Sequence, residues 1–125
     1  MINLDYRDDR SLHEQIADGF RELIVKGIMS SGEQLPSVRE LSVSLTVNPN
    51  TVQKAYKQLE LDGFVYSVKG KGSFVAQPKD VKQASGTQVL YDALVKAVSE
   101  LAFLGENEEE IHNLIKNIYQ ETEEM

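Results

Sequence analysis

The strongest constraint on this chain is a pair of helix-start signals in close succession, at Ser37 and Asn48. Ser37 opens the pattern Ser-x-x-Glu, a capping box in which hydroxyl and carboxylate bond reciprocally to backbone amides. Asn48 is a favoured N-cap, and the proline that follows it is favoured at the first helical position. Apolar residues recur at helical spacing after each start, and Gly63 is suited to end the second helix. The sequence therefore predicts two short helices, over about 38–45 and 49–61, joined by a tight turn.

A basic hairpin is predicted directly after the second helix. Segments 64–66 and 73–75 are rich in aromatic and β-branched residues, as short strands are. Between them, Lys-Gly-Lys-Gly at 69–72 places two cations on a turn where backbone can approach a phosphate closely. A plain hairpin turn is the alternative, and a nucleotide-binding loop is disfavoured because the other parts of a P-loop are missing. Two helices and a basic hairpin in this order indicate a winged helix-turn-helix, in which one helix enters a DNA groove.

The exposed face predicted for the N-terminal half of the second helix is polar and free of acidic residues, and the first acid after Glu40 is Glu60. The face consists of Asn48, Asn50, Thr51, Gln53, Lys54 and Lys57. Asparagine and glutamine can pair in bidentate fashion with adenine in the major groove, and a helix N-terminus beside a threonine suits a phosphate. An ordinary solvated face is the alternative, but in a chain with 20 Asp/Glu such a face is expected to carry an acid. The pattern therefore favours a DNA-reading helix.

Three stretches of the chain resemble the DNA-binding domain of the GntR family of bacterial transcription regulators. They read LHEQIADGFRELIVKGIMSSGEQ, LPSVRELSVSL and VNPNTVQKAYKQLELDGFVYSVKGKGSFV, and they span about residues 2–77. The resemblance implies a dimeric, repressor-like protein that binds a palindromic operator, with Arg39 contacting DNA and residues 70–72 forming the wing tip. Many family members have an arginine where Pro49 stands and another where Gln53 stands, so this chain is expected to read a different sequence. The Asn-Pro-Asn-Thr-Val form is similar to the small YtrA-like subgroup.

The predicted DNA-binding set joins the first helix start, the recognition helix and the wing. It comprises Ser37, Arg39, Asn48, Asn50, Thr51, Gln53, Lys54, Lys57, Lys69, Gly70, Lys71 and Gly72.

Charge is distributed unevenly along the chain. The formal net charge of −7 argues against a DNA partner at first sight. However, residues 1–79 hold ten Lys/Arg and ten Asp/Glu, whereas residues 80–125 hold three Lys/Arg and ten Asp/Glu. This asymmetry is the informative quantity. We therefore expect a winged DNA-binding domain over 1–79 and an acidic helical region over 80–125, an α+β fold overall.

Amphipathic helices are predicted on both sides of the winged block. A first helix is expected to start at Ser11 and to end at Lys26-Gly27, with a short strand before it at 3–5. Residues 78–86 have the composition of a short hinge or a frayed helix start. Two further helices, with a turn at 104–107 between them, have apolar stripes too large to cover each other. The stripes are predicted to form a homodimer interface of Leu90, Leu94, Val98, Leu101, Ile111, Leu114, Ile115 and Ile118. The alternative is that these helices fold back on the winged domain.

The sequence offers little for other chemistry. There are no cysteines, which leaves no thiol nucleophile or zinc-thiolate site and fits a reducing, cytoplasmic setting. No catalytic serine motif is present, so we expect no enzymatic activity. His112 beside Glu108 and Glu109 is expected to be a solvated helix face, and no metal or cofactor is predicted. No signal peptide or long apolar run suggests a membrane. A small-molecule effector is neither identified nor excluded.

Two functions therefore compete. The first is a dimeric transcription regulator, a repressor by resemblance, that binds a double-stranded palindromic operator. The second is a protein-interaction module, in which the winged helix and the acidic tail bind another protein without binding DNA. The acid-free helix face and the basic wing favour the first.

Overall fold

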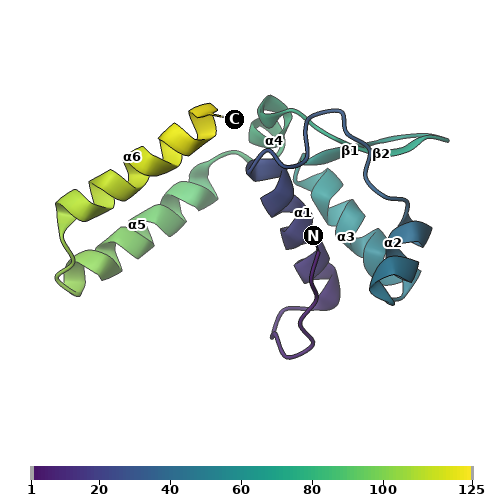
Figure 1. Ribbon diagram of the computed structural model, residues 1–125, viewed down its shortest axis with the longest axis horizontal. Coiled ribbons are helices and arrows are strands. Elements are labelled where there is room, and N and C mark those ends of the chain that lie inside the picture. Colours follow the sequence, from purple (N-terminus) through teal and green to yellow (C-terminus); the bar gives the residue numbers. More distant parts are fainter. Residues whose placement is uncertain (1, 125) are drawn as a thin grey trace. The chain divides into compact units, whose positions relative to one another are not determined.

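The computed structural model describes residues 2–124 and divides the chain into two compact units that meet between Ser85 and Gly86 (Figure 1). The first unit contains α1 (Leu12–Val25), α2 (Val38–Leu45), α3 (Pro49–Leu61), β1 (Val65–Val68), β2 (Gly72–Val75) and α4 (Pro78–Ser85). The second contains α5 (Gln88–Phe103) and α6 (Glu108–Glu124). The predicted order of two short helices, a hairpin and two terminal helices is confirmed, as is the α+β class.

The helix starts are fixed by the side chains that the sequence indicated. At α2, the Ser37 hydroxyl accepts from the amide of Glu40 at 3.0 Å, and the Glu40 carboxylate accepts from the amide of Ser37 at 3.4 Å. At α3, the Asn48 side-chain oxygen accepts from the amide of Asn50 at 2.8 Å. Ser11 caps α1 in the same way through the amide of Glu14. Each cap satisfies a backbone donor that the helix leaves unpaired.

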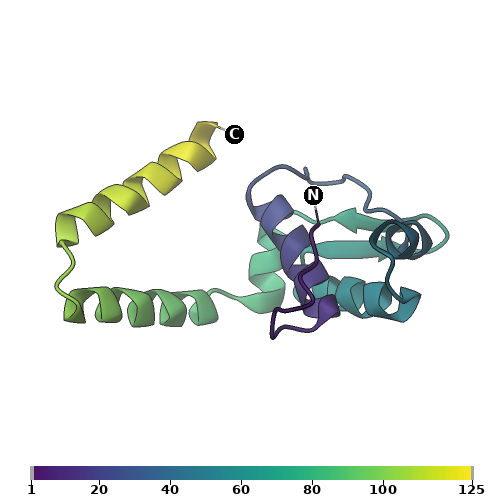
Figure 2. The same ribbon diagram turned by 60° about the horizontal axis from the view of Figure 1, so that its bottom comes forward.

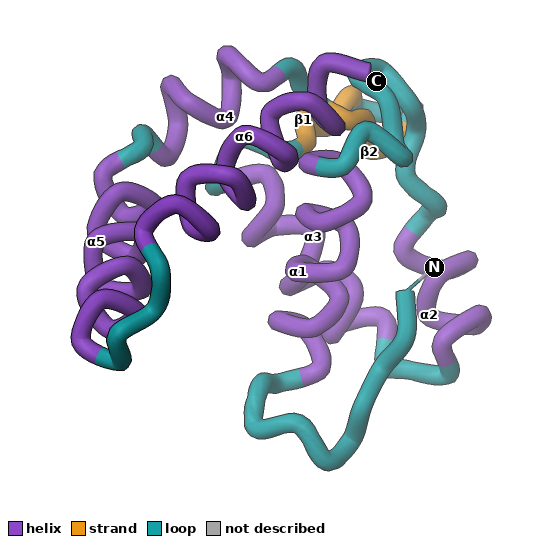
Figure 3. The backbone as a smooth tube through the Cα atoms, turned by 60° about the vertical axis from the view of Figure 1, so that its left-hand side comes forward, coloured by secondary structure: helices purple, strands orange, loops and turns teal. Residues whose placement is uncertain are grey.

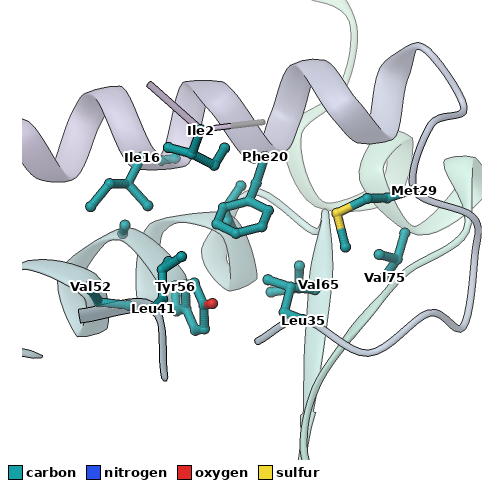
Figure 4. Packing of buried hydrophobic residues seen from close by; sticks show 13 residues of the cluster. Ile2, Ile16, Phe20, Met29, Leu35, Leu41, Val52, Tyr56, Val65 and Val75 are labelled. Carbon is teal, nitrogen blue, oxygen red and sulfur yellow. The ribbon is translucent and has the colours of Figure 1, made fainter. Parts of the chain in front are cut away.

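The core of the first unit lies between α1 and α3 and extends to the strands (Figure 4). Ile16 and Phe20 from α1 and Val52 from α3 are fully buried. The ring of Phe20 meets that of Tyr56 edge-on, with centroids 5.7 Å apart and an interplanar angle of 82°. Burial of each such side chain contributes roughly 1.5–3 kcal/mol. This packing holds the two helices together and turns the opposite face of α3 toward solvent.

The wing is an antiparallel hairpin in which Val65 pairs with Val75 and Val68 pairs with Gly72. Its strands therefore extend further toward the tip than the predicted segments. Residues 32–35, which precede α2, pair with the outer edge of β2. The amide of Leu35 donates to the carbonyl of Ser73, and the amide of Val75 donates to the carbonyl of Glu33, both at 2.9 Å. Strand β2 (orange in Figure 3) is thus hydrogen-bonded on both sides.

The short strand predicted at residues 3–5 is wrong. These residues form no strand, and the side chain of Gln15 takes up both backbone groups of Asp5. The Gln15 side-chain oxygen accepts from the amide of Asp5 at 2.8 Å, and its side-chain nitrogen donates to the carbonyl of Asp5 at 2.9 Å. The N-terminal segment is therefore held on α1, where Ile2 joins the core.

Of the two alternatives for residues 78–86, a short hinge or a frayed helix start, the structure has a helix, α4, over Pro78–Ser85. This helix packs against the corner between α3 and β1, at Gly63. The hydroxyl of Ser85 donates to the carbonyl of Asp62 at 2.8 Å and secures the last residue of the helix. The predicted domain boundary between residues 79 and 80 falls inside α4.

In the second unit, α5 and α6 are joined by a short loop (Figure 2). Asn107 caps α6 by accepting from the amide of Glu109 at 2.8 Å. Among the side chains described from residue 86 to residue 122, none is buried, and Val98 and Ile111 are half-buried. The apolar stripes of this unit are therefore exposed in the single chain. Over residues 2–124, no helix has the length and apolar character that crossing a bilayer requires.

Candidate nucleic-acid interface

Helix α3 separates its apolar and polar residues onto opposite faces. Val52, Ala55 and Leu59 have no exposed surface, and Tyr56 is only 7% exposed. The predicted contact residues lie on the other face. Thr51 is half-buried there, and the exposed ones are Asn48, Asn50, Gln53, Lys54 and Lys57. The first turn contains no acidic residue, so nothing of opposite charge offsets the positive end of the helix dipole.

Two of the predicted residues also have a structural role. The side-chain oxygen of Asn48 caps α3, and its side-chain amide nitrogen is the group that can donate to a base or phosphate. The hydroxyl of Ser37 accepts from Glu40 in the capping box of α2. Arg39, in the first turn of α2, is exposed.

The wing tip is a tight, exposed turn that carries two lysines. The amide of Lys71 donates to the carbonyl of Val68 at 2.9 Å and closes the turn. Gly70 and Gly72 have φ values of 78° and 120°, which side-chain-bearing residues adopt only with strain. A groove of about 420 Å³ runs between the wing and the start of α2. It brings together Ser37 and residues 69–72 of the predicted set.

A buried hydroxyl on α3 links this helix to the start of α2. The Tyr56 hydroxyl donates to the carbonyl of Pro36 at 2.6 Å. Burial, and then the negative charge of Glu40, raise the pKa of Tyr56 well above its ordinary value. The hydroxyl therefore stays protonated and remains a donor. Because Pro36 precedes the first turn of α2, this bond fixes that turn relative to the recognition helix.

The charges around this face are arranged in favour of a polyanion. Each acid of segment 36–79 accepts a hydrogen bond inside the unit, and one of them, Asp62, is paired with a cation. Glu40 belongs to the capping box, Glu60 accepts from the Ser67 hydroxyl at 3.2 Å, and Asp62 pairs with Arg21 at 3.0 Å. Within residues 2–124, no ion pair involves any of the cations Arg39, Lys54, Lys57, Lys69 and Lys71.

The residues considered for a metal lie elsewhere. His112 contacts Glu108 at 3.3 Å on the exposed surface of α6. In the part of the chain that the structure describes, no group of three or more His, Cys, Asp or Glu side chains is placed to hold a metal ion.

A polar recognition helix beside a basic wing defines a DNA-binding protein of the winged helix-turn-helix class. The family model for bacterial regulatory proteins of the gntR family matches residues 12–75, and the chain belongs to this family. The HTH-type transcriptional repressor YtrA of Bacillus subtilis (strain 168) is 36% identical over 119 residues, which cover 94% of this chain and 92% of that protein.

Solved structures agree with this assignment. A chain described as a transcriptional antiterminator from Listeria monocytogenes EGD-e has a TM-score of 0.70 and 34% identity, over 95% of this chain and 90% of that one. The DNA-binding domain of AraR, solved in complex with operator ORR3, has a TM-score of 0.53 and 28% identity, over 59% of this chain and 89% of that one. The protein is therefore a transcription regulator with a DNA-binding winged helix-turn-helix, which confirms the predicted family and the predicted class of function.

Proposed function

We propose that this regulator acts as a repressor that binds a palindromic operator as a homodimer, with α3 in the major groove and the wing against the backbone. The observation that carries the proposal is the exposed part of α3 from Asn48 to Lys57, which has amide side chains and lysines, no acid and no internal ion pair. Each relative's name or title describes that relative alone, but a repressor and an operator complex among them support the same role here. The role is one of binding rather than catalysis, and it places the protein in the cytoplasm with the DNA. No effector is assigned.

The contact residues have distinct roles in this proposal. Arg39, Lys54, Lys57, Lys69 and Lys71 neutralise phosphates and carry no sequence information. Asn50 and Gln53 read base edges, as amide side chains do with adenine. Asn48, Thr51 and the backbone of Gly70 and Gly72 approach the sugar-phosphate chain, and Ser37 positions the first turn of α2.

Dimerisation is proposed from the second unit. The predicted stripe is exposed there, with Leu90 at 71%, Leu114 at 59% and Ile118 at 52%. Further apolar residues outside the predicted stripe, including Tyr91, Val95 and Phe103, are also exposed on α5. Two short helices that bury so little are not expected to persist alone in water. A second copy of the unit would cover both stripes symmetrically.

Binding measurements at two salt concentrations test the DNA contacts. We expect Arg39→Ala and Lys71→Ala to weaken binding to all duplexes and to reduce the salt slope by about one each. Asn50→Ala and Gln53→Ala should instead relax the preference for particular bases, by roughly 1–3 kcal/mol each. Lys96→Ala is the matched control, since Lys96 is an exposed cation of α5 and does not belong to the proposed DNA-binding residues.

Equal losses on operator and random DNA for Asn50→Ala and Gln53→Ala would show that α3 is not the reading element. The absence of duplex binding by the unaltered protein, or binding without salt dependence, would overturn the DNA proposal. Such a result would favour the alternative of a protein-interaction module.

A further inference from the structure

We propose that Gln34 is a positioning residue for the wing, which holds the two wing lysines in a fixed place relative to the first turn of α2. This inference rests on the proposed contact between the wing and DNA. Gln34 itself is not placed against the duplex. It acts through the backbone of Lys71.

The side chain of Gln34 lies directly on the wing tip. Its amide nitrogen donates to the carbonyl of Lys71 at 2.7 Å. The same nitrogen occupies the space beside Gly72, since a Cβ added to that glycine would approach it to 2.9 Å. A side chain at Gly72 would therefore be strained by the φ of +120° and would also displace the Gln34 amide from its place on the wing.

The backbone of Gln34 is held against β2, so the position from which its side chain extends is fixed. Gln34 forms a bridge with Phe74 of β2, and the amide of Leu35 donates to the carbonyl of Ser73 at 2.9 Å. Only Leu35 and Pro36 separate Gln34 from Ser37, which starts α2. One short segment thus braces the wing and also begins the helix that carries Arg39.

The tip of the wing needs such a brace because the backbone of segment 32–35 pairs with β2 only from Ser73 to Val75. Beyond Ser73 the hairpin has two strands alone, which are marginal in water, and two of the three residues 70–72 are glycines. The Gln34 hydrogen bond is exposed, so its net contribution to global stability is small. Its effect is local, since it restricts where Lys69 and Lys71 can lie along a DNA backbone.

The test replaces Gln34 with methionine, which keeps the length of the side chain and removes the donor. Gln77→Met is the matched control, because Gln77 is an exposed glutamine of the same unit. We expect Gln34→Met to weaken operator binding and to flatten the salt slope in the same sense as Lys71→Ala. Combined with Lys71→Ala, it should weaken binding by less than the product of the two separate fold-changes, because both act on one contact.

Amide relaxation of the free protein provides a second readout that does not require DNA. Gly70 and Gly72 should have order parameters near 0.85 in the unaltered protein and the control, and lower values, toward 0.6, in Gln34→Met. The thermal midpoint should stay unchanged. If the unaltered protein binds no duplex, the proposed function fails, while the relaxation data still decide the role of Gln34.

Two results would overturn the role of Gln34. One is wild-type order at the wing together with wild-type affinity and salt slope in Gln34→Met. The other is a fall in the thermal midpoint with a parallel loss of affinity and no change in salt slope, which would indicate a general structural role.

Discussion

Thr46 adopts a conformation that its side chain disfavours. It ends α2 with φ 55° and ψ 50°, in the left-handed region. Among residues 2–124 it is the only non-glycine residue with a positive φ. A β-branched side chain is unfavourable there, at a cost of roughly 1–2 kcal/mol. The turn between α2 and α3 therefore retains some strain, and its geometry is maintained by the packing of the two helices.

We expect Thr46→Gly to raise the free energy of unfolding by about 1 kcal/mol, because glycine adopts this conformation without a steric penalty. Chemical denaturation of the variant and the unaltered protein measures the difference. Thr46→Val is the control, since it keeps the branched side chain and should give no such gain. A lower stability for Thr46→Gly would show that the extra entropy of glycine in the unfolded chain outweighs the relief of strain.

At Tyr56 we expect a pH-dependent effect. Tyr56→Phe should lower the free energy of unfolding by about 1 kcal/mol at neutral pH, since the bond to the Pro36 carbonyl is lost. The pKa of Tyr56 is raised in the folded protein, so the folded state favours the protonated hydroxyl. That contribution is complete below the ordinary tyrosine pKa of 10.0 and is lost as the pH rises above it.

Denaturation at a series of pH values tests this effect. Above pH 10 the unaltered protein should lose stability more steeply than Tyr56→Phe. The difference in the free energy of unfolding between the two proteins should therefore become smaller. Parallel curves across that range would contradict the assigned hydroxyl role.

Residues that act within one helix were predictable, and residues that act between segments were not. Ser37 and Asn48 were identified because a cap needs only its own next turn. Gln34 and Lys71 lie 37 residues apart in sequence, and their contact exists only after the hairpin folds. The role of Tyr56 was missed for the same reason, since its partner at Pro36 precedes a different helix.

At the scale of elements, α4 is the feature that local sequence described least well. Its polar residues, which begin with Pro78, suggested a hinge or a frayed helix start and no more than that. The helix is stabilised by its position against the α3–β1 corner, where Gly63 leaves room for it. A Cβ on Gly63 would lie 2.7 Å from the Cβ of Ala84 and 2.8 Å from the carbonyl oxygen of Asp80. Tertiary packing thus overrides a weak local preference.

We expect Gly63→Ala to destabilise the first unit by roughly 1–3 kcal/mol, since the added methyl group displaces α4 and φ is +83°. Gly32→Ala is a close control, because Gly32 has φ +86° with nothing within 4 Å of the added carbon. The control therefore measures the backbone penalty alone. Equal losses of stability in the two variants, measured by thermal unfolding, would show that α4 shifts to admit the methyl group without a loss of stability.

At the scale of the whole molecule, the two units differ in how they are stabilised. The first has a closed core built from α1, α3 and the strands. The second exposes nearly all of its described side chains. The amphipathic pattern predicted α5 and α6 correctly, but it could not show how little they bury within one chain. The buried fraction of these side chains depends on how the two helices are arranged. The apolar pattern of one helix does not determine that arrangement.

Removal of residues 86–125 should give a folded monomer with much weaker operator binding. Dimerisation would double the contacts per operator, so its loss should lower affinity far more than any one contact variant. Sedimentation and operator titration measure the two effects. A sedimentation profile that still corresponds to the assembly of the full chain would refute the proposed interface.

The deletion also removes acidic residues, which could by itself alter affinity for DNA. A full-length control with Leu94→Gln and Ile115→Gln keeps the net charge and disrupts the proposed interface. It should lose both self-association and operator affinity.

The packing of α4 also indicates where another domain can be fused to such a regulator. The family match ends at residue 75, and α4 then completes the first unit, up to the hydrogen bond of Ser85. Gly86 follows with φ +68° and no atom within 4 Å of where its Cβ would stand. A chain fused at this glycine would leave the core of the first unit intact. Gly86 is therefore a suitable fusion site, at which a foreign ligand-binding domain can be joined to the same DNA-binding unit.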